Sequence, residues 1–156
     1  MSTTVESELL TSEAFLSLPD KAGRDRIRVR GKVWEKRMTY RSAYHSCVVV
    51  YLGYLLTSWR EANGRPDLKV VGGEAGVRLR SDPATIVGID VAVVRTDSQL
   101  LTVGTRTIFD EPPLLSVEVL SPSDRQREIE TRVDEYLSAG VALVWIVSPH
   151  FRTVTV

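Results

Sequence analysis

The sequence predicts an α/β fold with a mixed central β-sheet. Helical and strand patterns alternate along the 156 residues, in the order helix, strands, helix, strands, helix, strands, and such alternation is typical of a sheet covered by helices. The length suits one domain, and no internal repeat or low-complexity linker divides the chain. We therefore expect residues 1–10 to form a loose arm and residues 11–156 to form a single domain.

Three stretches have the pattern of helices: Thr11–Leu18, Ser42–Arg60 and a stretch from Pro122 to about Ala139. Pro19 ends the first, because proline cannot continue a helix. In the second, apolar-face positions recur at a spacing of four and three residues, and they are His45, Val49, Leu52, Leu56 and Trp59. In the third, Ser123 and Gln126 have the spacing of a capping box. The apolar face of this last helix is expected to comprise Ile129, Val133, Tyr136 and Leu137.

Short β-rich stretches lie between these helices. The expected strands are Arg26–Lys36 (one strand, or a hairpin bent at Gly31), Leu68–Val71, Gly76–Arg80, Ile89–Arg95, Leu114–Leu120, Val141–Val147 and a last one that begins at Arg152. The weakly patterned stretch Asp97–Phe109 is expected to contain a loop. Gly140 separates the last helix from the strand that follows it.

The composition bounds the class of protein. Twenty basic residues balance twenty acidic ones, so net charge gives no general attraction to nucleic acid or to anionic membranes. The single cysteine, Cys47, excludes an internal disulfide and a cysteine zinc cluster, and we expect it to be buried in its helix. The longest apolar run, Cys47–Leu56, is about half of a membrane span, and the polar N-terminus is unlike a signal peptide. We expect a cytoplasmic protein without a membrane segment.

Two carboxylates inside apolar strands are the unusual chemical feature. Asp90 and Glu118 each sit among β-branched and leucine residues, and ionised carboxylates are rarely buried unless they are paired or bind a metal. On neighbouring strands the two would form a site for a hard cation such as Mg²⁺. The alternative is that each carboxylate pairs with an arginine or lies at a strand end. Phosphate-binding loops and serine nucleophile elbows are absent from the sequence.

Two further residues leave a functional and a structural interpretation open. Arg132 lies beside the apolar face of the last helix, so it either meets Glu118 or Asp90, or covers the core with its stem and keeps its head in water. His45, on the apolar stripe of the middle helix, is either a structural histidine or part of a site.

A run of basic residues alternates near the N-terminus: Arg24, Arg26, Arg28, Arg30 and Lys32. At the period of a strand these side chains share one face, with Ile27, Val29 and Val33 on the other. Such a stripe is suited to a phosphate backbone. It is equally suited to a solvated face that protects an edge strand from unwanted pairing.

Five sequence blocks, taken in order, resemble one known family. They are Gly73–Leu79 (GEAGVRL), Gly88–Val94 (GIDVAVV), Val117–Ser123 (VEVLSPS), Tyr136–Val141 (YLSAGV) and Val144–Val147 (VWIV). Over roughly residues 12–156 the chain resembles the Uma-type restriction-endonuclease family of the PD-(D/E)xK superfamily. The resemblance implies a restriction-endonuclease-like fold with a central mixed sheet flanked by helices. It also implies a homodimer and metal-dependent cleavage of phosphodiester bonds in nucleic acid, DNA above all.

The resemblance assigns roles to particular residues. Asp90 matches the aspartate of the PD element and Glu118 the acid of the (D/E)xK element, which implies that they bind Mg²⁺ or Mn²⁺. Leu120 stands where the lysine is expected, and Arg132 matches the position in the next helix to which this family moves it. Arginine keeps the charge but cannot serve as a general base.

Other departures concern the ends of the family pattern and the proline before Asp90. Ile89 replaces that proline. Relatives often carry an N-terminal glutamate that this chain lacks, and Glu74 is the nearest substitute. The chain stops at Val156, inside a strand that relatives extend, so we expect it to be shorter than they are. The main hypothesis is an Mg²⁺-dependent endonuclease. The alternatives are a degenerate nuclease that binds nucleic acid or a protein without cleavage, and a truncated remnant.

Overall fold

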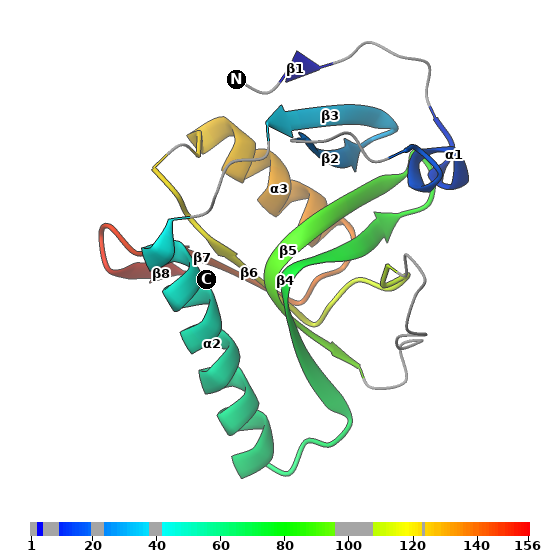
Figure 1. The fold of residues 1–156 in the computed structure, drawn as a ribbon. Coiled ribbons are helices and arrows are strands. Elements are labelled where there is room, and N and C mark those ends of the chain that lie inside the picture. The colour runs from blue at the N-terminus through cyan, green and yellow to red at the C-terminus, as the bar shows by residue number, and fades with distance from the viewer. Residues whose placement is uncertain (1–2, 5–9, 20–23, 38–41, 96–107, 123) are drawn as a thin grey trace.

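The computed structural model describes residues 3–4, 10–19, 24–37, 42–95, 108–122 and 124–156 (Figure 1). They form an eight-stranded mixed sheet and three helices. The strands are β1 (Thr3–Thr4), β2 (Arg24–Val29), β3 (Lys32–Arg37), β4 (Leu68–Arg80), β5 (Thr85–Arg95), β6 (Leu115–Val119), β7 (Leu143–Ser148) and β8 (Thr153–Thr155). The helices are α1 (Ser12–Leu16), α2 (Ala43–Ala62) and α3 (Gln126–Ser138).

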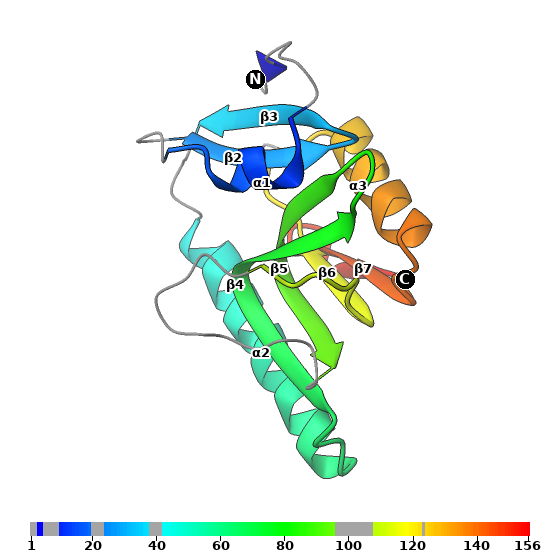
Figure 2. The same ribbon diagram turned by 90° about the vertical axis from the view of Figure 1, so that its right-hand side faces the viewer.

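Strand β5 is the centre of the sheet. It pairs antiparallel with β4 along its whole length. It also pairs with β2 at Ile86 and with β6 at Val91–Val93. Strand β4 lies along one side of β5, and β2 and β6 share its other side (Figure 2). Since β2 pairs at Ile86 and β6 only from Val91, the two strands separate between these residues, and Asp90 lies in this interval. Where the ladder stops, backbone N–H groups need other partners, and the Asp90 carboxylate accepts a hydrogen bond from one of them, the N–H of Val119.

The second half of the chain supplies the parallel part of the sheet. Strand β6 leads into α3, and α3 returns the chain to β7, which pairs parallel with β6 over the full length of β6. Strand β8 then pairs antiparallel with β7. The expected stretch Asp97–Phe109 falls mostly outside the described residues, and Phe109 forms a parallel bridge to Val77 of β4.

Two apolar clusters lie on opposite faces of the sheet, one under each long helix. Leu56 of α2 packs with Val91 and Val93 of β5. Tyr136 of α3 packs with Ala92, the residue between them. Because successive side chains of a strand point to opposite faces, α2 and α3 cover opposite faces of the sheet. None of the helices in the described part of the chain is long and apolar enough to cross a membrane.

Local chemistry explains most element ends. Ser42, the N-cap of α2, accepts a hydrogen bond from the backbone N–H of His45. The β2–β3 hairpin turns at Arg30 and Gly31, both with positive φ, as glycine readily allows. Two strands predicted separately join as β4 through a register shift between Gly72 and Ala75.

The predicted start of α3 is wrong. Gln126 is the first residue of the helix, with Arg125 as an N-cap that makes no side-chain hydrogen bond, so Gln126 cannot be the third residue of a capping box. Asp124 instead accepts hydrogen bonds from the backbone N–H and the hydroxyl of Ser121. This turn delays the helix. Ser123 lies outside the described residues.

Three burial predictions are also wrong. Cys47, expected in the core, is exposed. Trp59 and Leu137, expected on apolar faces against the sheet, are 48% and 55% exposed. The apolar spacing in α2 misleads because this helix is apolar on nearly all sides, so spacing alone does not identify its buried face.

Part of the expected N-terminal arm is paired. Thr3 and Thr4 pair with Trp34 and Glu35 of β3.

Candidate active site

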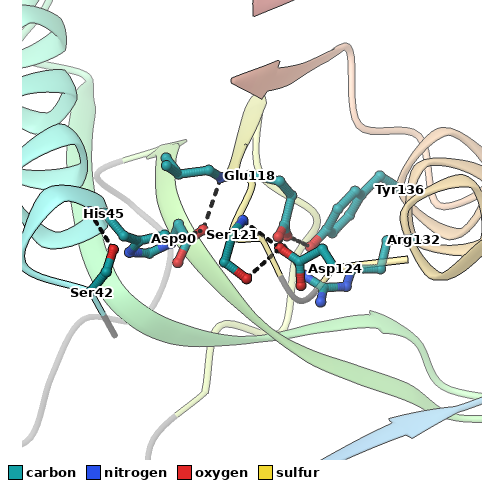
Figure 3. Close-up of polar contacts among 9 residues, drawn as sticks. Ser42, His45, Asp90, Glu118, Ser121, Asp124, Arg132 and Tyr136 are labelled. Atoms are coloured by element: carbon teal, nitrogen blue, oxygen red, sulfur yellow. Dashed lines mark hydrogen bonds and ion pairs between the residues drawn. The ribbon is translucent and has the colours of Figure 1, made fainter. Parts of the chain in front are cut away.

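Asp90 and Glu118 lie near each other on neighbouring strands, close enough for the charge of Asp90 to act on Glu118. The paired residues of β5 and β6 end at Val91 and Val117, and Asp90 and Glu118 are the next residues of their strands. Asp90 is 7% exposed and Glu118 is 5% exposed. The structure therefore brings together the two buried carboxylates that the sequence singled out (Figure 3).

Helix α3 provides two partners for Glu118. Arg132 and Tyr136 are four residues apart, so they project from the same side of the helix. The Arg132 Nη1 donates to Glu118 Oε2 at 2.5 Å. The Tyr136 hydroxyl donates to Glu118 Oε1. Of the two interpretations of Arg132, the structure favours the one in which its head meets Glu118.

The electrostatics of the site follow from burial. Loss of water raises the pKa of Glu118, and the nearby charge of Asp90 adds to this, while Arg132 and the Tyr136 hydroxyl act in the opposite direction. Glu118 in turn raises the pKa of Arg132. Burial, followed by the charge of Glu118, raises the pKa of Tyr136 well above its usual value. Arg132 is thus the cation, and Tyr136 the neutral donor, that stabilise a buried carboxylate.

Asp90 is held from the neighbouring strand β6 and from α2. Its Oδ2 accepts a hydrogen bond from the backbone N–H of Val119 at 2.9 Å. The His45 Nε2 lies 3.4 Å from the same oxygen. His45 is 5% exposed, and its Nε2 makes no hydrogen bond within the described part of the chain. The structure thus places this histidine beside Asp90.

A pocket lies against Glu118 and Arg132. Its wall includes the carboxylate residue Asp124, and the remaining lining is apolar: Leu120, Ile129 and Ile146. Sequence reasoning missed Asp124 and treated Tyr136 only as a core residue. The spacing of Tyr136 four residues after Arg132 is the signal that could have found it.

The donor set is compatible with a divalent cation. Mg²⁺ keeps several waters and is commonly held by one or two carboxylates together with substrate phosphates. Asp90 and Glu118 offer such a pair, although Arg132 and Tyr136 already contact Glu118. Within the described ranges no group of three His, Cys, Asp or Glu residues is arranged to hold a metal. The exposed Glu74 places its carboxylate over Gly88, in the β4 bulge.

The basic residues near the N-terminus lie in different environments, some paired or buried and others exposed. Arg26 donates to Glu35 at 3.0 Å and to the Pro19 carbonyl. Arg28 is 3% exposed, and burial lowers its pKa. Lys32 is exposed. It follows the turn and pairs with Val29, so it lies on the face opposite to Arg28, and the predicted single basic face is wrong for this residue.

Arg30 connects the hairpin to α3. Its Nε donates to Glu135 Oε1 at 2.6 Å, and Glu135 is 2% exposed. The Thr85 hydroxyl donates to the other oxygen of Glu135 at 3.3 Å. Arg30, predicted to bind nucleic acid, therefore has a structural partner on the helix that carries Arg132.

The chain is similar to known proteins over nearly its whole length. The model of a family described as "Uma2: Putative restriction endonuclease" matches residues 12–156. A crystal structure described as "a putative nuclease belonging to DUF820", from Anabaena variabilis ATCC 29413, has a TM-score of 0.73 and 18% identity, covering 93% of this chain and 77% of that one. No curated protein matches significantly. The similarity confirms the predicted restriction-endonuclease-like fold, and the family match shows that the chain belongs to the Uma2 family.

Proposed function

We propose that the chain is a divalent-metal-dependent nuclease that hydrolyses phosphodiester bonds in nucleic acid, with DNA as the expected substrate. The observation that carries the proposal is the proximity of the buried Asp90 and Glu118 on two neighbouring strands, with Arg132 on Glu118. A buried pair of like charges is costly unless cations compensate it. Membership of a family described as "Putative restriction endonuclease" supports the same reaction.

Asp90 and Glu118 would hold the metal, which we propose to be Mg²⁺ with Mn²⁺ as a substitute. When bound, such an ion stabilises charge on a phosphate and generates a nucleophilic water near neutral pH. The chain prepares both ligands in advance. The Val119 N–H fixes one oxygen of Asp90, and the Tyr136 hydroxyl fixes one oxygen of Glu118.

Arg132 would bind the scissile phosphate. A guanidinium has five N–H donors, and the bond to Glu118 uses Nη1. The side chain is 30% exposed and lines the pocket, so its other donors are available to phosphate oxygens. Because an arginine in a protein stays protonated, Arg132 stabilises charge and orients the phosphate rather than removing a proton from water.

Binding without cleavage is the second candidate, and one contact favours it. Arg132 neutralises Glu118 at 2.5 Å, which weakens the need of this carboxylate for a metal. A protein of this kind would bind nucleic acid or a protein partner and leave it intact. Contact of nucleic acid with Arg26, Arg28, Arg30 and Lys32 stays a prediction in both cases.

Plasmid nicking tests the proposal. Supercoiled plasmid and single-stranded DNA are incubated with Mg²⁺, Mn²⁺ or EDTA, and the wild type is compared with Glu118→Gln and Arg132→Lys. Two exposed residues of α3 supply matched controls, Asp134→Asn for the carboxylate and Arg127→Lys for the arginine. We expect metal-dependent nicking that is lost in Glu118→Gln and retained in both controls.

Two results would decide against the proposal. An inactive wild type with an active Arg132→Lys variant would identify a nuclease disabled by its arginine, as the second candidate requires. Nicking that persists in EDTA, or that Glu118→Gln leaves unchanged, would remove the carboxylate pair from the reaction.

A further inference from the structure

The outer face of α2 is apolar and uncharged. From Ala43 to Trp59 the helix contains no Asp, Glu, Lys or Arg residue. Its inner side packs on the sheet through Leu56, with Val49 and Leu52 beside it. Six large apolar residues nevertheless remain between 42% and 72% exposed, and they are Tyr44, Val50, Tyr51, Tyr54, Leu55 and Trp59. We call these six residues the α2 outer face.

Five of these residues share one side of the helix. At about 3.6 residues per turn, the five from Tyr44 to Leu55 lie on the half of the helix that faces away from Leu56. Trp59, three residues after Leu56, lies at the border with the inner side. Tyr51 and Tyr54 are in contact, with ring centroids 6.3 Å apart. The exposed Cys47 lies within the same side, one turn from Tyr44 and from Tyr51. Figures 1 and 2 show α2 at the edge of the molecule, with one side against β4 and the other turned away from the sheet.

The exposed area of the α2 outer face is large enough for a protein–protein interface. A buried aromatic side chain covers about 150–250 Å², so the exposed parts of four aromatic and two aliphatic residues amount to about 600 Å². That lies at the upper end of what an ordinary monomer exposes in one patch, about 300–600 Å². Two such faces together exceed the roughly 1,000 Å² that a specific protein interface requires.

The absence of charged residues indicates which kind of partner binds the α2 outer face. A phosphate backbone or an anionic membrane is bound through lysine and arginine, and Ala43–Trp59 has neither. A second copy of the chain offers the same uncharged apolar surface, and a two-fold axis makes one patch complementary to itself. We propose that the α2 outer face is the contact between two copies of this chain in a symmetric dimer. The proposal does not depend on the nuclease activity.

Solution mass provides the first test. Light scattering of the full chain should give twice the monomer mass of 17.4 kDa. Tyr54→Glu places a charge in the middle of the face and should give the monomer mass. Phe151→Glu, at another aromatic residue that is 75% exposed, should leave the dimer intact. A monomeric wild type, or a dimer that withstands Tyr54→Glu, would overturn the proposal. Circular dichroism establishes that both variants are folded.

The single cysteine provides a second test that needs no variant. Cys47 lies within the proposed contact, so association should shield its thiol from alkylation. The rate of alkylation should fall by about tenfold or more as the protein concentration rises through the dissociation constant, by mass action. A rate that is the same at all protein concentrations would contradict the proposal, because the face would then be open throughout.

Discussion

Helices α2 and α3 cover opposite faces of one sheet and use opposite kinds of residue to do so. Helix α3 is rich in charge, yet it buries Glu135 and Tyr136 completely. Helix α2 has no charge before Arg60, yet it exposes four aromatic rings. Each helix therefore departs from the usual pattern of apolar inside and polar outside. In α3 the departure makes a polar site, and in α2 it leaves an unpartnered surface.

The inward polar groups of α3 are tolerated because each has a partner. Arg132 and Tyr136 share the carboxylate of Glu118. Glu135 receives Arg30 from the hairpin and Thr85 from β5. A buried polar group is costly mainly when its partner is missing. Removal of one partner at a time should thus distinguish the inner side of α3 from its outer side and from α2.

The largest loss should follow Arg132→Ala. It leaves Glu118 buried without its cation, and loss of one member of a buried pair costs about 3 kcal/mol of unfolding free energy. Urea unfolding at pH 7 measures the loss, and Arg127→Ala, on the exposed side of α3, is the control. A loss of less than about 0.5 kcal/mol, the usual range for surface changes, would mean that Glu118 does not depend on Arg132.

Glu135→Ala should come next, with a loss of about 2 kcal/mol, because the buried Thr85 hydroxyl loses its acceptor. Its neighbour Asp134 is exposed, so Asp134→Ala should change the unfolding free energy by less than about 0.5 kcal/mol. Thermal and urea unfolding of the two variants compare adjacent acids on opposite sides of one helix. Equal losses would contradict the assignment of Glu135 to the inner side.

A dependence on pH should follow from Glu118. Burial raises its pKa in the folded state, so the folded chain binds the proton more tightly than the unfolded chain does. The stability that this adds is complete below the unfolded pKa, near 4.5, and is lost as the pH rises through the folded pKa. In EDTA the wild type should therefore gain stability relative to Glu118→Gln between pH 7 and pH 5. A relative loss over this range would show that the pKa is lowered instead.

The smallest effect is expected on α2. Val50 is 72% exposed, so Val50→Ser should change the unfolding free energy of the monomer by less than about 0.5 kcal/mol. The measurement is made at the lowest protein concentration that allows it, where association contributes least. A loss above about 1 kcal/mol in the monomer would mean that this residue packs within its own chain.

Much of the site could be predicted from the sequence. Asp90 and Glu118 interrupt apolar strands, and an isolated carboxylate in such a strand requires a partner. The same reasoning placed Arg132 beside the apolar face of its helix, and left open whether its head meets Glu118 or Asp90 or stays in water. The hairpin turn at Gly31 and the body of α2 also follow from local chemistry. The similarity of ordered blocks to a known family added the strand arrangement that brings the two carboxylates together.

The remaining details depend on tertiary packing. Cys47 was expected inside because a free cysteine behaves as a small core residue, and Trp59 because it continues the apolar spacing of α2. Both are exposed. Apolar residues surround α2 on nearly all sides, so periodicity does not reveal which side meets the sheet. Lys32 changes face because the hairpin turns two residues before it. Glu135 becomes buried through Arg30, which is 105 residues away in the sequence. No local sequence pattern indicates a partner that is so far away in the sequence.

The central claim is that Asp90 and Glu118 act together as one cation site, and Mn²⁺ binding tests it most directly. Electron paramagnetic resonance of free Mn²⁺ measures binding without any need for cleavage. The wild type should bind Mn²⁺, and Asp90→Asn should lose that binding while its unfolding free energy stays within about 1 kcal/mol, because the amide oxygen still accepts the Val119 N–H. Unchanged Mn²⁺ binding in folded Asp90→Asn, or a wild type that binds none, would contradict the claim.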